Sequence, residues 1–351
     1  MVTSTGSRTV REMSTQYLRR LSLIVATPSG AGLEFGSFRV VFETHRGDTQ
    51  TPNTCDIKIY NLQQSTANQL APNGGVSEFT QLLLKVAYGS DPLMQIFYGS
   101  IKQTRRGRED QLNSYVAITA ADGDEAYNFA PAAFTLASGA VQQTAFTNLI
   151  QAMAQASLAS TPVGQGSGQP ITQGYAPTMS PTPLIRGRTY YGACRDEMRS
   201  LAKAADCTWS IQDGKVTFIP KTSYIPGDPV LISPTTGLIG VPEQTQNGLE
   251  VRTLLNPNIK IGQTIKLQST DINALRYGLD NQSVSTNFSL QQGAAATNAD
   301  GLYYVMRAEH SGDTRGNNWY TDLVCIAINA TVTAAQSVQQ AAITPPAVFQ
   351  Y

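Results

Sequence analysis

The stretch Cys55-Asp56-Ile57-Lys58-Ile59-Tyr60 alternates between apolar and polar side chains. Its two isoleucines stand two residues apart, and the charged Asp56 and Lys58 each precede one of them. Because successive side chains of a β-strand point to opposite faces, this spacing gives the segment one buried and one solvated face. The stretch therefore predicts a half-buried β-strand.

Similar β-type runs lie on both sides of this stretch, and most are bounded by Gly, Pro, Asn or Asp. In the first third of the chain they are Leu21 to Ala26, Phe38 to Thr44, Gln81 to Tyr88, Gln95 to Lys102 and Ser114 to Ala121. They return at Val230 to Ser233, Gly248 to Leu254, Gln263 to Ser269, Leu302 to Ala308 and Tyr320 to Asn329. Such series favour two antiparallel sandwiches or barrels over alternating βαβ units.

The middle of the chain has a different pattern. Apolar residues at near-helical spacing predict helices over Thr144 to Ala159 and over Tyr190 to Ala205. Asp213-Gly214 between two β-type runs, Thr208 to Ile211 and Lys215 to Ile219, predicts a hairpin with a tight turn. Residues 160–187 are rich in Gly, Pro, Ser and Thr, and we expect a long exposed loop or arm there.

These patterns predict a mainly β fold with an α/β middle region, in which two β domains flank a smaller mixed domain. The expected divisions are an N-terminal arm over 1–17, a first β domain over 18–122, a mixed domain over 123–222, a second β domain over 223–332 and a C-terminal tail over 333–351. A chain of 351 residues exceeds the size at which one core usually stops growing, which also favours several units.

Composition narrows the classes of partner. The 25 basic and 25 acidic side chains cancel, which leaves no overall field to attract nucleic acid or an anionic membrane. Low charge with a net balance of zero favours association with partner subunits. No apolar stretch approaches the length of a membrane span, so we expect no stable membrane insertion. The four cysteines form no CxxC pair, and we expect them reduced and buried.

A search for reactive groups identifies only weak candidates. His45 and His310 stand near carboxylates, as a metal site or a general base would require, but two loop histidines are the simpler interpretation. The cluster Asp122-Gly123-Asp124-Glu125 suits either Ca²⁺ or the start of a helix, and we favour the helix. The run Arg105-Arg106-Gly107-Arg108 indicates a hairpin tip rather than a phosphate contact. Phosphate-binding loops and a GxSxG elbow are absent, so we predict no catalytic, cofactor or metal site.

Three stretches, in this order and spacing, resemble the baseplate hub, or tail hub, proteins of tailed bacteriophages. The stretches are Pro52 to Leu62, then Thr236 to Pro242 with Asn247 to Val251 and Leu254 to Gly262, then Gly301 to Val305 with His310 to Gly316 and Trp319 to Thr321. The positions that carry the resemblance, to which we assign structural roles, are Pro52, Asn53, Tyr60, Asn61, Leu62, Gly237, Gly240, Gly248, Asn256, Pro257, Gly262, Gly312, Asp313 and Trp319. The glycines are expected at turns, and Trp319 is expected to anchor the last strand in the core.

The resemblance implies a structural role without cofactors. Hub proteins of this family form a homotrimeric ring in which each subunit contributes two tube-like β-barrels, so that three chains match the six-fold tail tube. The implied partners are the tail tube or distal tail protein, the spike or tip protein, the tape-measure protein, and DNA in transit through the channel. The implied location is the tail baseplate or tip of the virion, after assembly in the host cytoplasm.

Two other functions remain open from the sequence. A tail-associated peptidoglycan hydrolase is the first, because some hubs carry a fused enzyme and Asp122 to Glu125 form an acidic cluster. A carbohydrate-binding adhesion module is the second, because β-rich proteins with exposed tyrosines and long loops often bind glycans. We expect a non-enzymatic protein, because residues 122–220 offer no convincing pair of catalytic acids.

Overall fold

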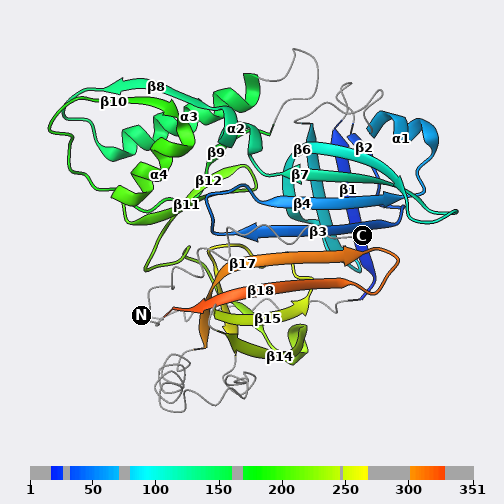
Figure 1. Cartoon of the computed structure of the whole chain (residues 1–351). Coiled ribbons are helices and arrows are strands. Elements are labelled where there is room, and N and C mark those ends of the chain that lie inside the picture. The colour runs from blue at the N-terminus through cyan, green and yellow to red at the C-terminus, as the bar shows by residue number, and fades with distance from the viewer. Residues whose placement is uncertain are drawn as a thin grey trace, which may run out of the picture.

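A computed structural model of the chain describes residues 17–26, 32–70, 80–159, 169–245, 248–267 and 301–328. The predicted C-terminal tail, residues 1–16 of the predicted arm and residues 160–168 of the predicted loop lie outside the described residues. The mainly β fold class with an α/β middle region is confirmed. Figure 1 shows two β-rich parts, one above the other, with the helices gathered beside the upper one.

The first β unit contains seven strands and one short helix. They are β1 (Arg19–Ala26), β2 (Gly32–Glu34), β3 (Val40–Gly47), β4 (Thr54–Tyr60), α1 (Gln64–Leu70), β5 (Gln81–Tyr88), β6 (Met94–Arg108) and β7 (Ser114–Ala121). The strands pair antiparallel in the order β3-β4-β7-β6-β5-β1-β2. All six predicted strands of this part are therefore confirmed.

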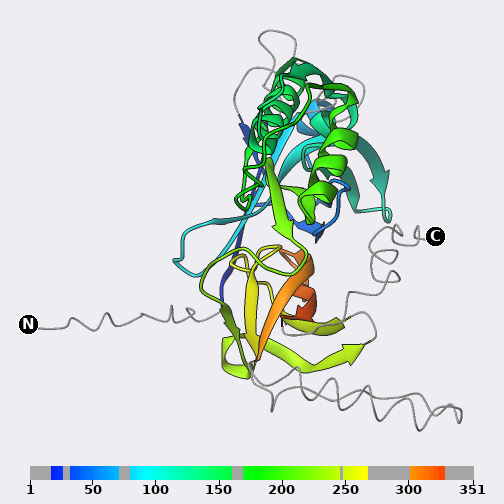
Figure 2. The same ribbon diagram turned by 90° about the vertical axis from the view of Figure 1, so that its left-hand side faces the viewer.

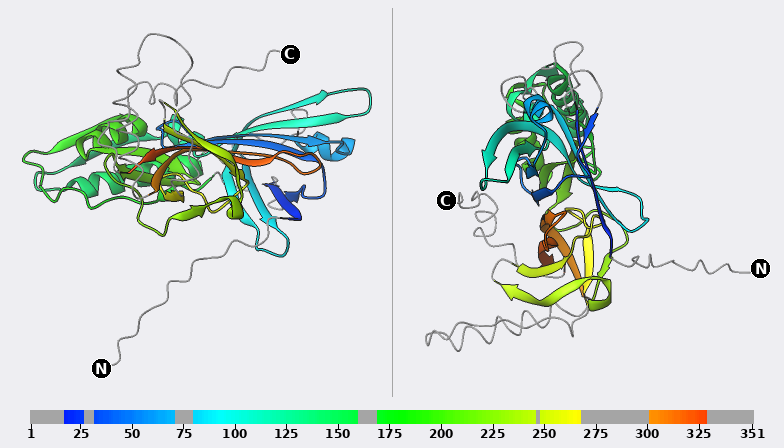
Figure 3. Two further views of the ribbon diagram at one scale, coloured as in Figure 1. Left: turned by 90° about the horizontal axis from the view of Figure 1, so that it is seen from below. Right: turned by 90° about the vertical axis from the view of Figure 1, so that its right-hand side faces the viewer.

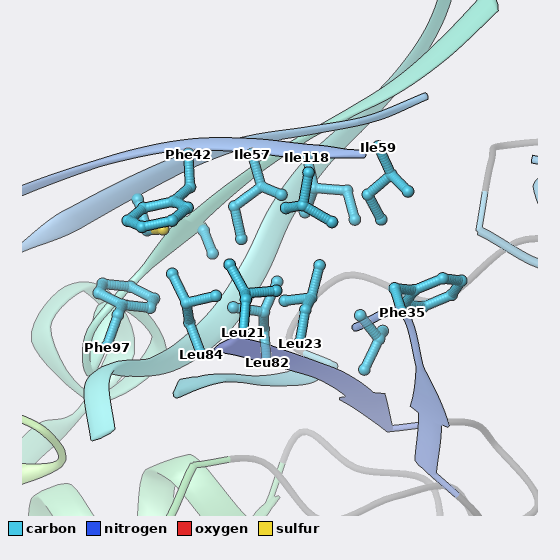
Figure 4. Close-up of a cluster of buried hydrophobic side chains, with 14 of the residues drawn as sticks. Leu21, Leu23, Phe35, Phe42, Ile57, Ile59, Leu82, Leu84, Phe97 and Ile118 are labelled. Carbon is cyan, nitrogen blue, oxygen red and sulfur yellow. The ribbon is translucent and has the colours of Figure 1, made fainter. Parts of the chain in front are cut away.

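The core of the first β unit lies between two layers of the same curled sheet. Figure 4 shows Leu23 and Leu84 facing Ile57 and Phe42 on the opposite layer. All four side chains are at most 2% exposed. Because the alternating residues of each strand point to one face, folding the sheet over brings the two apolar faces together and removes both from water.

The mixed unit contains three helices and five strands. They are α2 (Asp124–Phe129), β8 (Pro131–Leu136), α3 (Gln142–Ala159), β9 (Thr172–Gln173), β10 (Arg188–Ala193), α4 (Cys194–Ala204), β11 (Cys207–Gln212) and β12 (Lys215–Pro220). Phe146 of α3, Met198 of α4 and Trp209 of β11 meet in a separate core. The predicted β11–β12 hairpin is confirmed, with Asp213 and Gly214 both at positive φ.

Two predictions for the mixed unit hold only in part. The second helix begins at Cys194, because Tyr190 and its neighbours pair with β8 and the Tyr190 ring stacks on Phe134 at 4.8 Å. The segment expected to be an exposed arm also contributes to the core, since Ile171 and Met179 are 3% and 6% exposed. In both places contacts with distant residues outweigh the local pattern.

The second β unit follows. It contains β13 (Val230–Ile232), the 3-10 turn η1 (Pro234–Thr236), β14 (Leu238–Thr245), β15 (Gly248–Leu254), β16 (Thr264–Leu267), β17 (Leu302–Asp313) and β18 (Trp319–Ala327). Its core includes Ile265, Val305, Leu323 and Cys325, all at most 2% exposed. The five predicted strands here are confirmed, and β17 continues five residues beyond the predicted end.

The two β units share one sheet. β17 pairs antiparallel with β3 from Arg307↔Gly47 to Asp313↔Val41, which places the thirteen strands of both units in a single ladder. Figure 2 shows the second unit below the other two, with the mixed unit in front of the first β unit. The relative orientation of the two β units is therefore set by backbone hydrogen bonds rather than by a flexible linker.

All four cysteines are free and buried, which confirms the prediction of reduced thiols. Burial raises the pKa of each of them, so the thiolate is disfavoured. Among the described helices, none is long and apolar enough to cross a membrane.

Gly312 provides a test of how tightly the seam between the β units is packed. A Cβ at this position would lie 2.5 Å from Phe42 and 2.8 Å from Trp319, whose rings meet edge to face at 5.6 Å. We predict that Gly312→Ala lowers the free energy of unfolding by about 1–3 kcal/mol through overpacking. Gly227→Ala is the control, because its Cβ would meet nothing within 4 Å. Urea denaturation measures both, and equal effects would contradict the prediction.

Candidate functional site

The outward face of the shared sheet is polar across the seam. Neighbouring strands β3, β17 and β18 place Glu43 beside Ser311 and Ser311 beside Tyr320. The next row runs from His45 through Glu309 and Asp322 to Arg252 on β15. All these side chains are partly or fully exposed. We call this surface the polar face.

Charges on the polar face are paired across strands. His45 Nδ1 lies 3.0 Å from Glu309 Oε1, and Arg307 also bonds Glu309. Arg252 binds Asp322 through two nitrogens, at 2.6 and 3.1 Å. The hydrogen bond that His45 donates to Glu309 raises the pKa of His45 against the effect of burial, and the same bond lowers the pKa of Glu309. Acidic and basic groups thus neutralise one another along this surface.

A second polar cluster is buried where the mixed unit meets the first β unit. Arg46 of β3 donates to the Ile96 carbonyl at 2.8 Å and to Asp213 Oδ2 at 2.8 Å. Its side chain is only 3% exposed. Asn53 donates to Ile211 O at 3.0 Å and to Gln212 Oε1 at 2.9 Å. We call Arg46, Asn53, Asp122, Gln169, Gln212 and Asp213 the buried joint.

Asp122 holds the turn of the β11–β12 hairpin. Its carboxylate accepts hydrogen bonds from the backbone N–H groups of Asp213 and Gly214 and from Gln169 Nε2 at 2.7 Å. The Gln169 oxygen in turn accepts from Gly123 N at 2.7 Å. Asp122 is 1% exposed, so these donors replace the water that a free carboxylate would bind. The sequence predicts that this acidic cluster starts a helix. Its first residue, Asp122, also binds the turn of a hairpin about ninety residues away in the chain.

Burial and neighbouring charges shift the pKa values in and around the joint. Burial, and then the charge of Asp213, raises the pKa of Asp122 to about 7. Burial would also raise the pKa of Asp213, but the cations of Arg46 and Lys260 outweigh it and lower that pKa. Burial and the charge of Arg46 lower the pKa of Lys260 to about 8. The group is thus a coupled set of charges shared by all three units.

Asp48 connects the same three units on a neighbouring path. Its Oδ2 accepts a hydrogen bond from Thr208 Oγ1 of the mixed unit at 2.8 Å and from the Tyr304 hydroxyl of the second β unit at 2.6 Å. Burial raises the pKa of Asp48 despite these donors. One loop residue of the first unit therefore contacts both of the others.

The motif positions of the first stretch contact other residues through hydrogen bonds, a cation–ring contact and core packing. Asn53 belongs to the buried joint, and Pro52 precedes it. The Tyr60 ring lies under the Arg39 guanidinium at 4.6 Å, and Leu62 packs against the first core. Asn61, at φ 53°, accepts from Ser114 N and donates to Asn113 Oδ1.

The motif positions of the other two stretches lie at strand ends and at contacts between units. Positive φ angles are found at Gly237, Gly240, Gly248 and Gly262. Gly262 approaches β12 so closely that a Cβ would lie 2.5 Å from Ile219 Cδ1. Asn256 accepts from Asn258 N across Pro257 at 3.0 Å. Asp313 forms an ion pair with Arg39 at 2.9 Å beside Gly312, and Trp319 is 1% exposed in the core, as expected.

The structure corrects the placement of the two histidines and largely agrees with that of the basic run. His45 and His310 are strand residues, in β3 and β17, rather than loop residues, because the pairing of these strands extends through both. The run Arg105 to Arg108 forms the end of β6, and the turn follows it. In the part of the chain that the structure describes, no three His, Cys, Asp or Glu side chains gather as metal ligands would.

Sequence reasoning missed Arg46, Gln169, Gln212 and Lys260. An arginine in an alternating strand and two glutamines in loop-like segments carry no local sign of burial. The one available signal is that Arg46 occupies an inward position of the alternation that begins at Val40. Only the approach of the β11–β12 hairpin gives that charge a partner.

The buried joint predicts strong coupling between Arg46 and Asp213. Arg46→Met should lower the free energy of unfolding by about 3–5 kcal/mol, because it removes the buried guanidinium that forms the ion pair with Asp213. Asp213→Asn keeps the positive φ tolerable and removes the charge. The double variant should lose less than the sum of the two single losses. Denaturation of all four proteins tests this, and additive effects would show that the pair is not coupled.

His310 predicts a dependence of stability on pH. Its Nδ1 lies 2.9 Å from Thr321 Oγ1 in a fully buried site, and burial together with the charge of Arg46 lowers its pKa to about 3. Because the folded pKa lies below the unfolded value of about 6.5, stability is complete above pH 6.5 and falls as the pH approaches 3. Relative to His310→Gln, the native chain should lose about 1.4 kcal/mol per pH unit in that window. Parallel denaturation profiles from pH 7.5 to 4 would refute this.

The comparisons with known proteins agree with the sequence resemblance. Residues 187–278, about a quarter of the chain, match the family model described as baseplate hub gp41. No curated protein sequence matches. The 43 kDa tail protein of prophage MuSo2 from Shewanella oneidensis shares the fold, with a TM-score of 0.52 at 7% identity over 89% of this chain and 99% of that one.

A tail protein from Neisseria meningitidis aligns with a TM-score of 0.49 at 8% identity, over 88% of this chain and 96% of that one. The fold assignment rests on the Shewanella protein, which exceeds a TM-score of 0.5. The matched family is described as a baseplate hub protein, which agrees with the expected structural role in the tail of a virion. The family-model match over residues 187–278 agrees with the resemblance of this chain to the baseplate hub proteins of tailed phages, and the Shewanella tail protein shares its fold.

Proposed function

We propose that this protein is a hub subunit whose three copies form a ring, adapting a six-fold tail tube to a three-fold spike or tip. The observation that carries the proposal is the single thirteen-stranded sheet that holds two β units in one chain. Each unit has its own buried core, so three chains present six β units around an axis. The β3–β17 pairing keeps the two units of a chain at a constant angle, as a ring with regular spacing requires.

The polar face is proposed to line the channel. A conduit for DNA has to be wetted, but it must not hold phosphate groups strongly. The paired charges at His45–Glu309 and Arg252–Asp322 supply polarity without a large field of either sign. The opposite faces of these strands bury the cores and are not available to a channel.

The ring would contact different partners at its two rims. One rim would meet the tail tube or distal tail protein, and the other the spike or tip protein. The tape-measure protein and then DNA would occupy the channel. The mixed unit, attached through the buried joint, would hold a defined position on the ring. Its β11–β12 hairpin forms hydrogen bonds with Arg46, Asn53 and Asp122.

The acidic cluster does not support the hydrolase alternative. Asp122, Asp124 and Glu125 are 1%, 5% and 3% exposed. Glycoside cleavage needs two carboxyl groups that flank a polymer strand. These three carboxyl groups face polypeptide, and Asp122 is already occupied by three donors.

The mass of the purified protein in solution tests the proposal. A trimer of the 37.7 kDa chain has a mass of about 113 kDa, three times the single-chain value. We predict this mass by light scattering at micromolar concentration, and ring-shaped particles with a central opening by electron microscopy. A protein that stays at the mass of one chain up to millimolar concentration would disprove the ring.

A further inference from the structure

The hairpin between β6 and β7 is a basic projection. β6 is the longest of the described strands, and its last part exposes Arg105, Arg106 and Arg108. Within the described residues, no carboxylate forms an ion pair with any of these three. Arg105 bonds Gln103 at 3.0 Å and Arg106 bonds Asn68 at 2.6 Å, both uncharged partners. Figure 3 shows the hairpin extending away from the body of the molecule.

The turn of this hairpin is rigid and ends in an exposed apolar residue. Asp110 accepts hydrogen bonds from Leu112 N at 2.7 Å and from the backbone and side chain of Asn113 at 2.6 and 2.8 Å. Glu109 lies within hydrogen-bonding reach of the Tyr60 hydroxyl. The turn's own carboxylates are thus engaged, while Leu112 is 89% exposed. A preorganised turn loses little conformational entropy when it binds a partner.

The β14–β15 end of the same sheet carries the opposite charge. Glu243 and Glu250 are directly opposed across these two strands, and both are exposed. Like charges in directly opposed positions destabilise a strand pair. Val241, two residues before Glu243, is 53% exposed. Four strands, β18, β17, β3 and β4, separate this acidic end from the basic hairpin.

We propose that the basic β6–β7 hairpin of one protomer docks on the acidic β14–β15 end of the next protomer in the ring. Arg106 and Arg108, whose side chains lie on the same face of β6, would face Glu243 and Glu250, and Leu112 would cover Val241. This proposal rests on the proposed ring and specifies how its subunits join. The occupant is a second copy of this chain because its two ends carry charges of opposite sign. Each end also has an exposed apolar side chain, Leu112 or Val241.

The geometry also suits a closed ring. A contact between two different ends of one molecule is heterologous, and it closes into a ring when the rotation between neighbours permits. The edge strand β14 is poorly suited to backbone pairing with a neighbour, because Pro242 removes a donor and the register shifts between Ile239 and Glu243. Side-chain docking is therefore favoured over continuation of the sheet at this end.

Charge reversal tests the contact. Arg106→Glu with Arg108→Glu, or Glu243→Lys with Glu250→Lys, should weaken the trimer roughly 10- to 100-fold in dissociation constant, as light scattering over a dilution series measures. Combining all four substitutions should restore most of the affinity. The matched control is Lys215→Glu with Arg186→Glu, two exposed cations of the mixed unit. Circular dichroism of every variant checks folding.

A covalent test does not depend on charge. Leu112→Cys combined with Val241→Cys should form disulfides between protomers on mild oxidation, giving a covalent trimer on a non-reducing gel, whereas each single variant should not. The four native thiols are buried and should not interfere.

The outcomes separate this contact from the ring itself. Loss with either reversal, recovery in the combined variant and cross-linking of the double cysteine variant support the contact. A trimer that resists both reversals and does not cross-link would overturn the contact and leave the ring standing. Failure of the combined variant to recover, with intact folding, would also overturn it. A native chain that is monomeric at every concentration would refute both proposals.

Discussion

The antiparallel pairing of β3 with β17 is the constraint on which the rest of the structure depends. It joins residues more than 250 positions apart in the chain, from Arg307↔Gly47 to Asp313↔Val41. The pairing converts two separate β units into one sheet, and it also sets which side chains share the polar face. Without it, His45 would have no Glu309 beside it, and the rings of Phe42 and Trp319 would not meet across Gly312.

The buried joint solves a different problem, the attachment of the mixed unit. A buried guanidinium, a buried carboxylate and a second, partly buried one are expensive to remove from water, and they are tolerable only when almost every donor and acceptor has a partner. Arg46 and Asp122 meet this condition through the turn of the β11–β12 hairpin. An apolar contact would tolerate small rotations, whereas this set of directional bonds specifies one orientation. For a subunit proposed to repeat around a ring, a defined orientation matters more than added stability.

The predictions from sequence succeeded where the local pattern and the tertiary environment agree. The alternation in Cys55 to Tyr60 and in the other strands follows from the burial of one face, so it is visible in the residues themselves. The Asp213-Gly214 turn was predicted for a similar reason, since the positive φ angles of such a turn favour few residue types. The predicted helix start failed at Tyr190, because residues with helical spacing pair with β8 as a strand. The predicted exposed loop failed at Ile171, which is buried in the core of the mixed unit.

The sequence by itself determined the strands, the hairpin, the absence of recognisable catalytic motifs and the resemblance to baseplate hub proteins. These depend on the spacing between nearby residues, and such a pattern can be read directly from the amino-acid sequence. Only the tertiary structure decided that the two β units share one sheet, that Arg46 and Asp122 form a buried joint, and that opposite charges lie at two ends of the sheet. Those features arise from pairings between distant segments, whose register is chosen by the burial of both partners at once and by neither segment alone.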